Sequence, residues 1–112
     1  MTESFELIQI ETSRGRVDCR YYRAEGSNIG VIMVGGIGGD FDTPADNLYP
    51  RLCSGFKDIG ISSLRVKFRH PTDLTESVID VLVGIQFLKS ENLRVFGLIG
   101  HSFGGAVVVQ AA

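Results

Sequence analysis

A serine lies at the centre of the most informative stretch of this sequence, Gly100–Gly104, which reads G-H-S-F-G. The G-x-S-x-G spacing is typical of a strand that turns sharply into a helix, because glycines two residues before and after the serine let the backbones pack closely. The apolar run Arg94–Ile99 precedes it, and small residues follow from Gly105. The pattern marks Ser102 as a candidate nucleophile. The alternative is a serine that merely caps the following helix.

A second glycine-rich segment follows another apolar run. Gly30–Val34 reads as a buried strand, and Gly35-Gly36-Ile37-Gly38-Gly39 comes directly after it. This loop could be a plain turn or a cradle for a nucleotide phosphate. No G-x-G-x-x-G fits it, because Phe41 stands where the last glycine should be, and no Gly-Lys-Ser/Thr follows. We therefore expect no nucleotide cofactor.

Two strands and a helix are predicted around this segment. The alternating pattern of 5–10 and 17–21, with a tight glycine turn between them, predicts an antiparallel hairpin near the N-terminus. A helix is predicted over 48–59, with Pro50 in its first turn and Gly60 as its stop. Its predicted inner positions are Leu52, Phe56 and Ile59.

The second half of the sequence alternates strands and helices. A core strand is predicted over 61–68, where the alternation of Arg65 and Lys67 with apolar residues suggests one thinly covered face. Asp73–Glu76 resembles a capping box at the start of a helix that runs to about Lys89. This order predicts an α/β domain with a parallel core sheet, and the whole of 1–112 reads as a single domain.

Composition and charge exclude several classes of partner. The net charge of −2 offers no basic field for nucleic acid or anionic membrane, and no apolar stretch approaches the length of a membrane span. No signal-peptide pattern opens the sequence, so a cytoplasmic protein is expected. The two cysteines, Cys19 and Cys53, lack metal-site spacing and read as reduced packing residues.

The order of these elements resembles the N-terminal half of the α/β-hydrolase superfamily. The resemblance rests on the glycine-rich loop Gly35–Gly39 and on Gly100–Gly105, and the compact spacing is similar to that of dienelactone hydrolases and other small carboxylester hydrolases. It implies three αβα layers around a mostly parallel sheet with an antiparallel N-terminal hairpin, an incomplete α/β-hydrolase fold.

The resemblance also implies roles for particular residues. Ser102 would attack an ester or thioester of a small-molecule acyl substrate and form an acyl-enzyme. The backbone N–H of Phe103 would face the oxyanion, and a second donor would come from Gly36, Ile37 or Gly38. No cofactor and no metal are implied.

The acid and the histidine that follow the serine in this superfamily are missing after Ser102. His101 reads as a packing residue of the turn or a substrate-lining one. His70 reads as a loop histidine before a proline or as a substrate contact. Asp40 and Asp42 could line a substrate or cap a helix, and their spacing with His70 supports no metal site.

We therefore expect the sequence to be the front part of a longer hydrolase, with an open sheet edge that invites self-association. Two other functions stay open at this point. One is a non-catalytic α/β module that completes its sheet with a partner chain. The other, which the missing nucleotide motifs make the weaker one, is a nucleotide-binding α/β domain.

Overall fold

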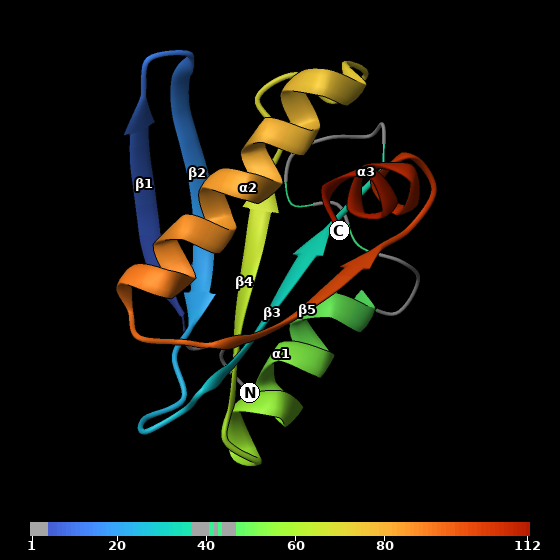
Figure 1. Cartoon of the computed structure of the whole chain (residues 1–112). Helices are drawn as coiled ribbons and strands as arrows, with labels where there is room; N and C mark the ends of the chain where they lie inside the picture. Colours follow the sequence, from blue (N-terminus) through green and yellow to red (C-terminus); the bar gives the residue numbers. More distant parts are fainter. Residues whose placement is uncertain (1–4, 37–40, 42, 44–46) are drawn as a thin grey trace.

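The computed structural model describes residues 5–36, 41, 43 and 47–112 of the chain. Within these described residues, five strands form one sheet in the order β1-β2-β4-β3-β5, and three helices pack on it (Figure 1). The elements are β1 Glu6–Thr12, β2 Gly15–Tyr22, β3 Ile29–Val34, α1 Leu48–Asp58, β4 Ile61–Lys67, α2 Leu74–Ser90, β5 Val95–Gly100 and α3 Phe103–Ala111.

The sheet has an antiparallel part and a parallel part. The β1–β2 hairpin is antiparallel and β2 runs antiparallel to β4, whereas β3 runs parallel to both β4 and β5. The predicted α/β class, with an N-terminal hairpin and a parallel core, is confirmed. Val34 pairs with Val66 on one side and with Gly100 on the other. The segments that follow β3, β4 and β5 therefore begin at the same edge of the sheet.

Helices cover both faces of the sheet, which confirms the three predicted layers. In Figure 1, α2 crosses in front of β2 and β4. Along β3, Ile32 and Val34 join a core cluster with residues of α2 and α3, whereas Val31 and Met33 join a second cluster with α1. Burial on both faces explains the continuous apolar run of this strand.

The inner face of α1 differs in part from the prediction. Tyr49 and Cys53 are its buried residues, and Leu52 and Phe56 pack beside them. The expectation that Ile59 faces the core is wrong, because the helix ends at Asp58 and the Ile59 side chain is 70% exposed. Gly60 follows with φ of +84°, a left-handed conformation that favours glycine at a helix end.

The expectation of a thinly covered face on β4 is also wrong. Arg65 is only 3% exposed, and Ser62 and Ser63 beside it are buried too. A guanidinium N–H of Arg65 donates to the carbonyl oxygen of Phe41 at 2.6 Å. An arginine can be buried in this way when its head group is hydrogen-bonded, so the alternating charge pattern did not indicate an exposed face.

Helix α2 begins where the capping pattern predicts. The carboxylate of Asp73 accepts a hydrogen bond from the Glu76 N–H at 3.0 Å. The Glu76 side chain does not close the box but pairs with Arg14 at 2.6 Å and with Arg69 at 3.1 Å. Arg69 also pairs with Asp80, which is fully buried. These ion pairs join the turn of the hairpin to α2.

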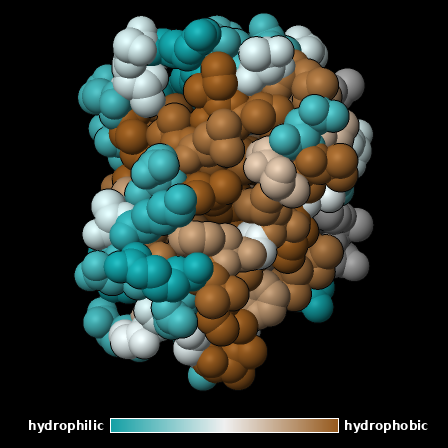
Figure 2. All heavy atoms as spheres, viewed as in Figure 1, coloured by the Kyte–Doolittle hydropathy of each residue, from teal (hydrophilic) through white to brown (hydrophobic). Residues whose placement is uncertain are grey.

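Apolar side chains cover much of the face formed by α2 and α3 (Figure 2). The exposed members include Leu82 on α2 and Val109 on α3, the latter 72% exposed. Within the part of the chain that the structure describes, no helix is both long enough and apolar enough to cross a membrane.

Both cysteines, Cys19 and Cys53, are buried thiols outside any disulfide, so we predict that neither reacts in the native protein. Burial raises the pKa of the Cys19 thiol to about 12, which leaves almost no thiolate at pH 8. Reaction with a chromogenic disulfide reagent at pH 8 should release no colour from the folded protein and a signal for two thiols in denaturant. Rapid labelling of the folded protein would contradict the buried positions of Cys19 and Cys53.

Candidate active site

The turn between β5 and α3 holds Ser102 in a conformation that non-glycine residues rarely adopt. Its φ is +55° and its ψ is −124°, values of the first central residue of a mirror-image type II turn. The Gly104 N–H closes this turn on the carbonyl oxygen of His101 at 2.9 Å. The side chain of Ser102 is exposed and makes no capping hydrogen bond to α3. This strained, outward-facing serine has the geometry that the G-x-S-x-G spacing predicts.

The two glycines that flank Ser102 allow backbones to approach each other closely. A Cβ atom on Gly100 would overlap the backbone of Gly104, and one on Gly104 would overlap the carbonyl group of Gly35. The third glycine of the segment is different, because a Cβ on Gly105 would meet its nearest neighbour, the Gly100 oxygen, at 3.6 Å. Glycine is therefore required by packing at Gly100 and Gly104, but not at Gly105.

The start of α3 presents a backbone donor beside Ser102. The N–H groups of Gly104 and Gly105 donate to His101 and Ser102 at 2.9 and 3.0 Å, whereas no described residue accepts from the N–H of Phe103. The first N–H groups of a helix also carry the positive end of its dipole. Anionic oxygen would be stabilised at this position.

The end of β3 lies directly beside this turn. Val34 pairs with Gly100, and Gly35 then packs against Gly104. Gly36 is buried at the start of the glycine-rich loop. Ile37, Asp40 and Asp42 lie outside the described residues, so the predicted roles of Ile37 and Asp40 stay predictions.

Tyr49 connects the end of β3 to the turn, and sequence reasoning missed it. Its hydroxyl donates to the carbonyl oxygen of Val34 at 2.9 Å and lies 3.3 Å from Nδ1 of His101. The tyrosine is 2% exposed. The spacing of Tyr49 and Cys53 along the helix predicts only that Tyr49 lies in the core. A buried tyrosine hydroxyl needs a hydrogen-bond partner, and this requirement is the one sequence signal that could have pointed to its contacts.

Comparisons with known proteins bear on the fold. No family model matches the chain, and no curated protein matches it. Among solved structures, a dienelactone hydrolase from Anabaena variabilis superposes with a TM-score of 0.81 at 13% identity, over 97% of this chain and 56% of that one. A Xanthomonas campestris protein described as an α/β serine hydrolase without a lid gives 0.71 at 17% identity, over 100% and 57%. The chain has the α/β-hydrolase fold.

A Pyrococcus furiosus esterase, Pf2001, is also similar, with a TM-score of 0.75 and 22% identity over 96% of this chain and 45% of that one. The chain spans about half the length of these structures. The α/β-hydrolase fold expected from the sequence is therefore confirmed, over a part of the fold that corresponds to an N-terminal half.

The α/β-hydrolase fold brings some of the predicted site residues together and separates others. Ser102, Phe103 and Gly36 lie at one edge of the sheet, after β5 and β3. The rings of His101 and Tyr49 meet edge to face, with centroids 5.8 Å apart. His70 is exposed in the turn between β4 and α2, where its carbonyl oxygen accepts from Asp73 and Ser77. Among the described residues, neither histidine is hydrogen-bonded to Ser102.

Two arginines of the sheet contact Phe41. Arg20 and Arg65 are directly opposite each other on β2 and β4. The guanidinium of Arg20 lies 4.1 Å from the ring centre of Phe41, and Arg65 binds the carbonyl oxygen of the same residue. A cation over an aromatic face is a favourable contact, and it fixes Phe41 over the sheet.

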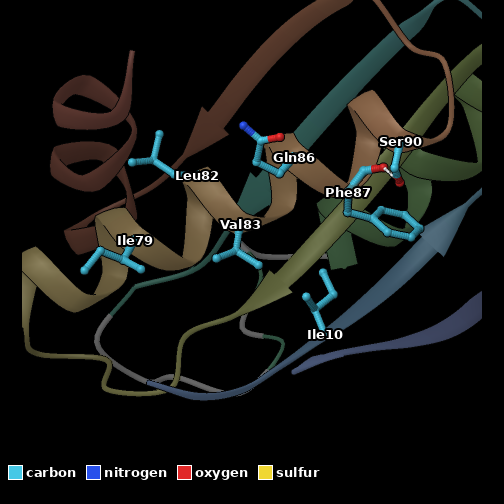
Figure 3. Close-up of a pocket in the computed structure, with 7 residues that line it drawn as sticks. All are labelled: Ile10, Ile79, Leu82, Val83, Gln86, Phe87 and Ser90. Atoms are coloured by element: carbon cyan, nitrogen blue, oxygen red, sulfur yellow. Dashed lines mark hydrogen bonds between the residues drawn. The ribbon is translucent and has the colours of Figure 1, made fainter. Parts of the chain in front are cut away.

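An apolar groove on the α2 face is separate from the Ser102 turn (Figure 3). It has a volume of about 430 Å³ and lies between β1 and α2, with Ile10 facing Val83 and Phe87. Its lining residues all come from β1 and α2. Among the described residues, no three His, Cys, Asp or Glu side chains gather in a way that could hold a metal ion.

We predict opposite effects of alanine at the two neighbouring glycines of α3. Gly104→Ala should lower the free energy of unfolding by at least about 2 kcal/mol, because its methyl group would overlap the Gly35 backbone. Gly105→Ala should leave stability unchanged or raise it by up to roughly 1 kcal/mol, because alanine favours the helix and has space there. Urea unfolding measures both. Equal stability of the two variants would show that the close approach of α3 to β3 is absent.

Proposed function

We propose that this protein is a serine hydrolase that cleaves the ester or thioester bond of a small acyl substrate through an acyl-enzyme on Ser102. The observation that carries the proposal is the exposed serine at φ +55°, one residue before a helix whose first N–H has no acceptor among the described residues. A strained serine at a strand-to-helix turn, next to a free backbone donor, is the arrangement that acyl transfer requires.

In the proposed reaction, Oγ of Ser102 forms a bond to the carbonyl carbon, and the carbonyl electron pair moves onto the oxygen. The N–H of Phe103 would stabilise that oxyanion, with a second N–H from Gly36, Ile37 or Gly38. The tetrahedral intermediate then expels an alcohol or a thiol and leaves the acyl group on Ser102. Water attacks the ester so formed, releases the acid and restores the serine.

The reaction needs a base that accepts the proton of Ser102. Neither His70 nor His101 is placed to do so. The ring of His101 is held against Tyr49, and His70 lies in the turn that precedes α2. In serine hydrolases of this kind the base is a histidine that is oriented by an acid. Cys19 and Cys53 are buried thiols that form no disulfide, which fits a reducing compartment, so we propose a cytoplasmic enzyme.

A fluorophosphonate probe tests the nucleophile. We expect the probe to add to Ser102, found by mass spectrometry of the digested protein, and the adduct to be lost in Ser102→Ala. Ser90→Ala is the matched control, because Ser90 is also an exposed serine but lies at the end of α2. Without a base the probe reacts more slowly but still with the same serine, so long incubations are used. Equal labelling of Ser102→Ala and Ser90→Ala would refute the nucleophile.

A second proposal concerns binding between chains at the outer edge of β5. This strand, V-F-G-L-I-G, carries no charge, whereas the opposite edge strand β1 carries Glu6 and Glu11. Among the described residues, β5 pairs only with β3. An apolar groove of about 560 Å³ lies beside it, lined by residues of α2, β5 and α3 and by Ala112. An uncharged edge strand next to an apolar groove favours pairing with a second copy of the chain.

Lysine substitutions at the two edges test this second proposal. Val95 is 51% exposed on β5, and Leu7 is 72% exposed on β1. We expect Val95→Lys to shift the sedimentation coefficient of the 112-residue chain towards that of a monomer, because a charge on the edge opposes pairing. Leu7→Lys should leave the self-association unchanged. A monomeric parent chain, or equal effects of both variants, would contradict pairing through β5.

A further inference from the structure

The buried hydroxyl of Tyr49 sits between the two segments that the proposed reaction depends on. It lies 2.9 Å from the carbonyl oxygen of Val34, the last residue of β3, and 3.3 Å from Nδ1 of His101, the residue before Ser102. A tyrosine hydroxyl has one proton to donate. Because that proton goes to Val34, the ring nitrogen of His101 must supply the hydrogen of the second contact.

We infer that Tyr49 is a positioning residue of the Ser102 site, which holds His101 in the tautomer with hydrogen on Nδ1 and thereby ties the turn at Ser102 to the end of β3. The effect of Tyr49 on the reaction of Ser102 rests on the proposed function. The hydrogen bond from His101 to Tyr49 rests only on the two distances.

The contacts of Tyr49 extend to a third segment. Its backbone N–H donates to Oγ1 of Thr43 at 2.9 Å, which joins the start of α1 to the segment that follows β3. The side chain is 2% exposed, so its hydrogen bonds do not compete with water. A single buried residue therefore connects α1, the end of β3 and the residue next to the candidate nucleophile.

The carbonyl group that accepts from Tyr49 also takes part in the close packing at the turn. A Cβ atom on Gly104 would lie 2.9 Å from the Val34 oxygen. Movement of Val34 would therefore change both the hydrogen bond of Tyr49 and the contact of α3 with β3. Two of the proposed oxyanion donors, Phe103 and Gly36, are the chain neighbours of Gly104 and Gly35, the residues in this contact. Tyr49 would hold the spacing between them.

Tyr49→Phe tests the inference because it removes the hydroxyl and keeps the ring. Nitrogen-15 NMR of the neutral His101 ring should show the Nδ1–H tautomer in the parent protein. In Tyr49→Phe it should shift towards the Nε2–H tautomer. The rate of fluorophosphonate addition to Ser102 should fall about ten-fold or more, as for other residues that orient a reacting group.

Tyr21→Phe is the matched control. Tyr21 is 1% exposed, as deeply buried as Tyr49, but it lies on the other face of the sheet with its ring against Phe87. The substitution should change neither the tautomer of His101 nor the rate of addition to Ser102. A loss of addition through general destabilisation would appear in both variants.

The tautomer of the parent protein decides the inference even if Tyr49→Phe fails to fold. An Nε2–H tautomer in the parent, or a Tyr49→Phe protein that keeps both the tautomer and the rate of addition, would overturn it. The proposed function fails separately, when Ser102→Ala reacts with the probe like the parent. The NMR measurement involves no reaction, so it distinguishes the two failures.

Discussion

The close approach of two backbones, at Gly104 and Gly35, is the constraint on which the rest of the site depends. There is no space for a side chain between α3 and the end of β3, nor between Gly100 and Gly104. Because α3 must start this close to the sheet, the chain turns within one residue, and Ser102 takes a conformation with positive φ at the corner. The strain at Ser102 is thus maintained by the packing of its neighbours, which is how such conformations persist in folded proteins.

Polar groups buried around this contact hold the loops that the sheet alone cannot position. Tyr49 binds the last carbonyl group of β3 and meets His101, and Arg65 binds the carbonyl oxygen of Phe41 beyond the glycine-rich loop. Both side chains lie on the α1 face, and both are almost fully buried. This face of the sheet is therefore more than a packing surface for α1. Tyr49 of α1 joins the end of β3 to the residue before Ser102, and Arg65 of β4 holds Phe41.

Sequence patterns predicted the elements well where hydrophobic spacing and glycine positions decide the structure. The hairpin, the strand before Gly35, the capped start of α2 and the turn at Ser102 all follow from local rules, and all are present. The failures concern side chains whose burial depends on distant partners. The alternation of Arg65 and Lys67 suggests a thinly covered face, because the acceptor of Arg65, Phe41, is far away in the sequence. Ile59 is predicted to be buried, but α1 ends one residue earlier than the predicted helix. Tyr49 was missed for the same reason as Arg65.

The central claim, that Ser102 and the N–H of Phe103 form one site for a tetrahedral oxyanion, is tested most directly by a crystal structure of the fluorophosphonate adduct. The phosphonyl oxygen stands in for the oxyanion of the reaction. The account predicts a bond from Oγ of Ser102 to phosphorus, with that oxygen within hydrogen-bond distance of the Phe103 nitrogen, about 2.7–3.1 Å. An adduct whose oxygen points into solvent, away from the start of α3, would contradict it.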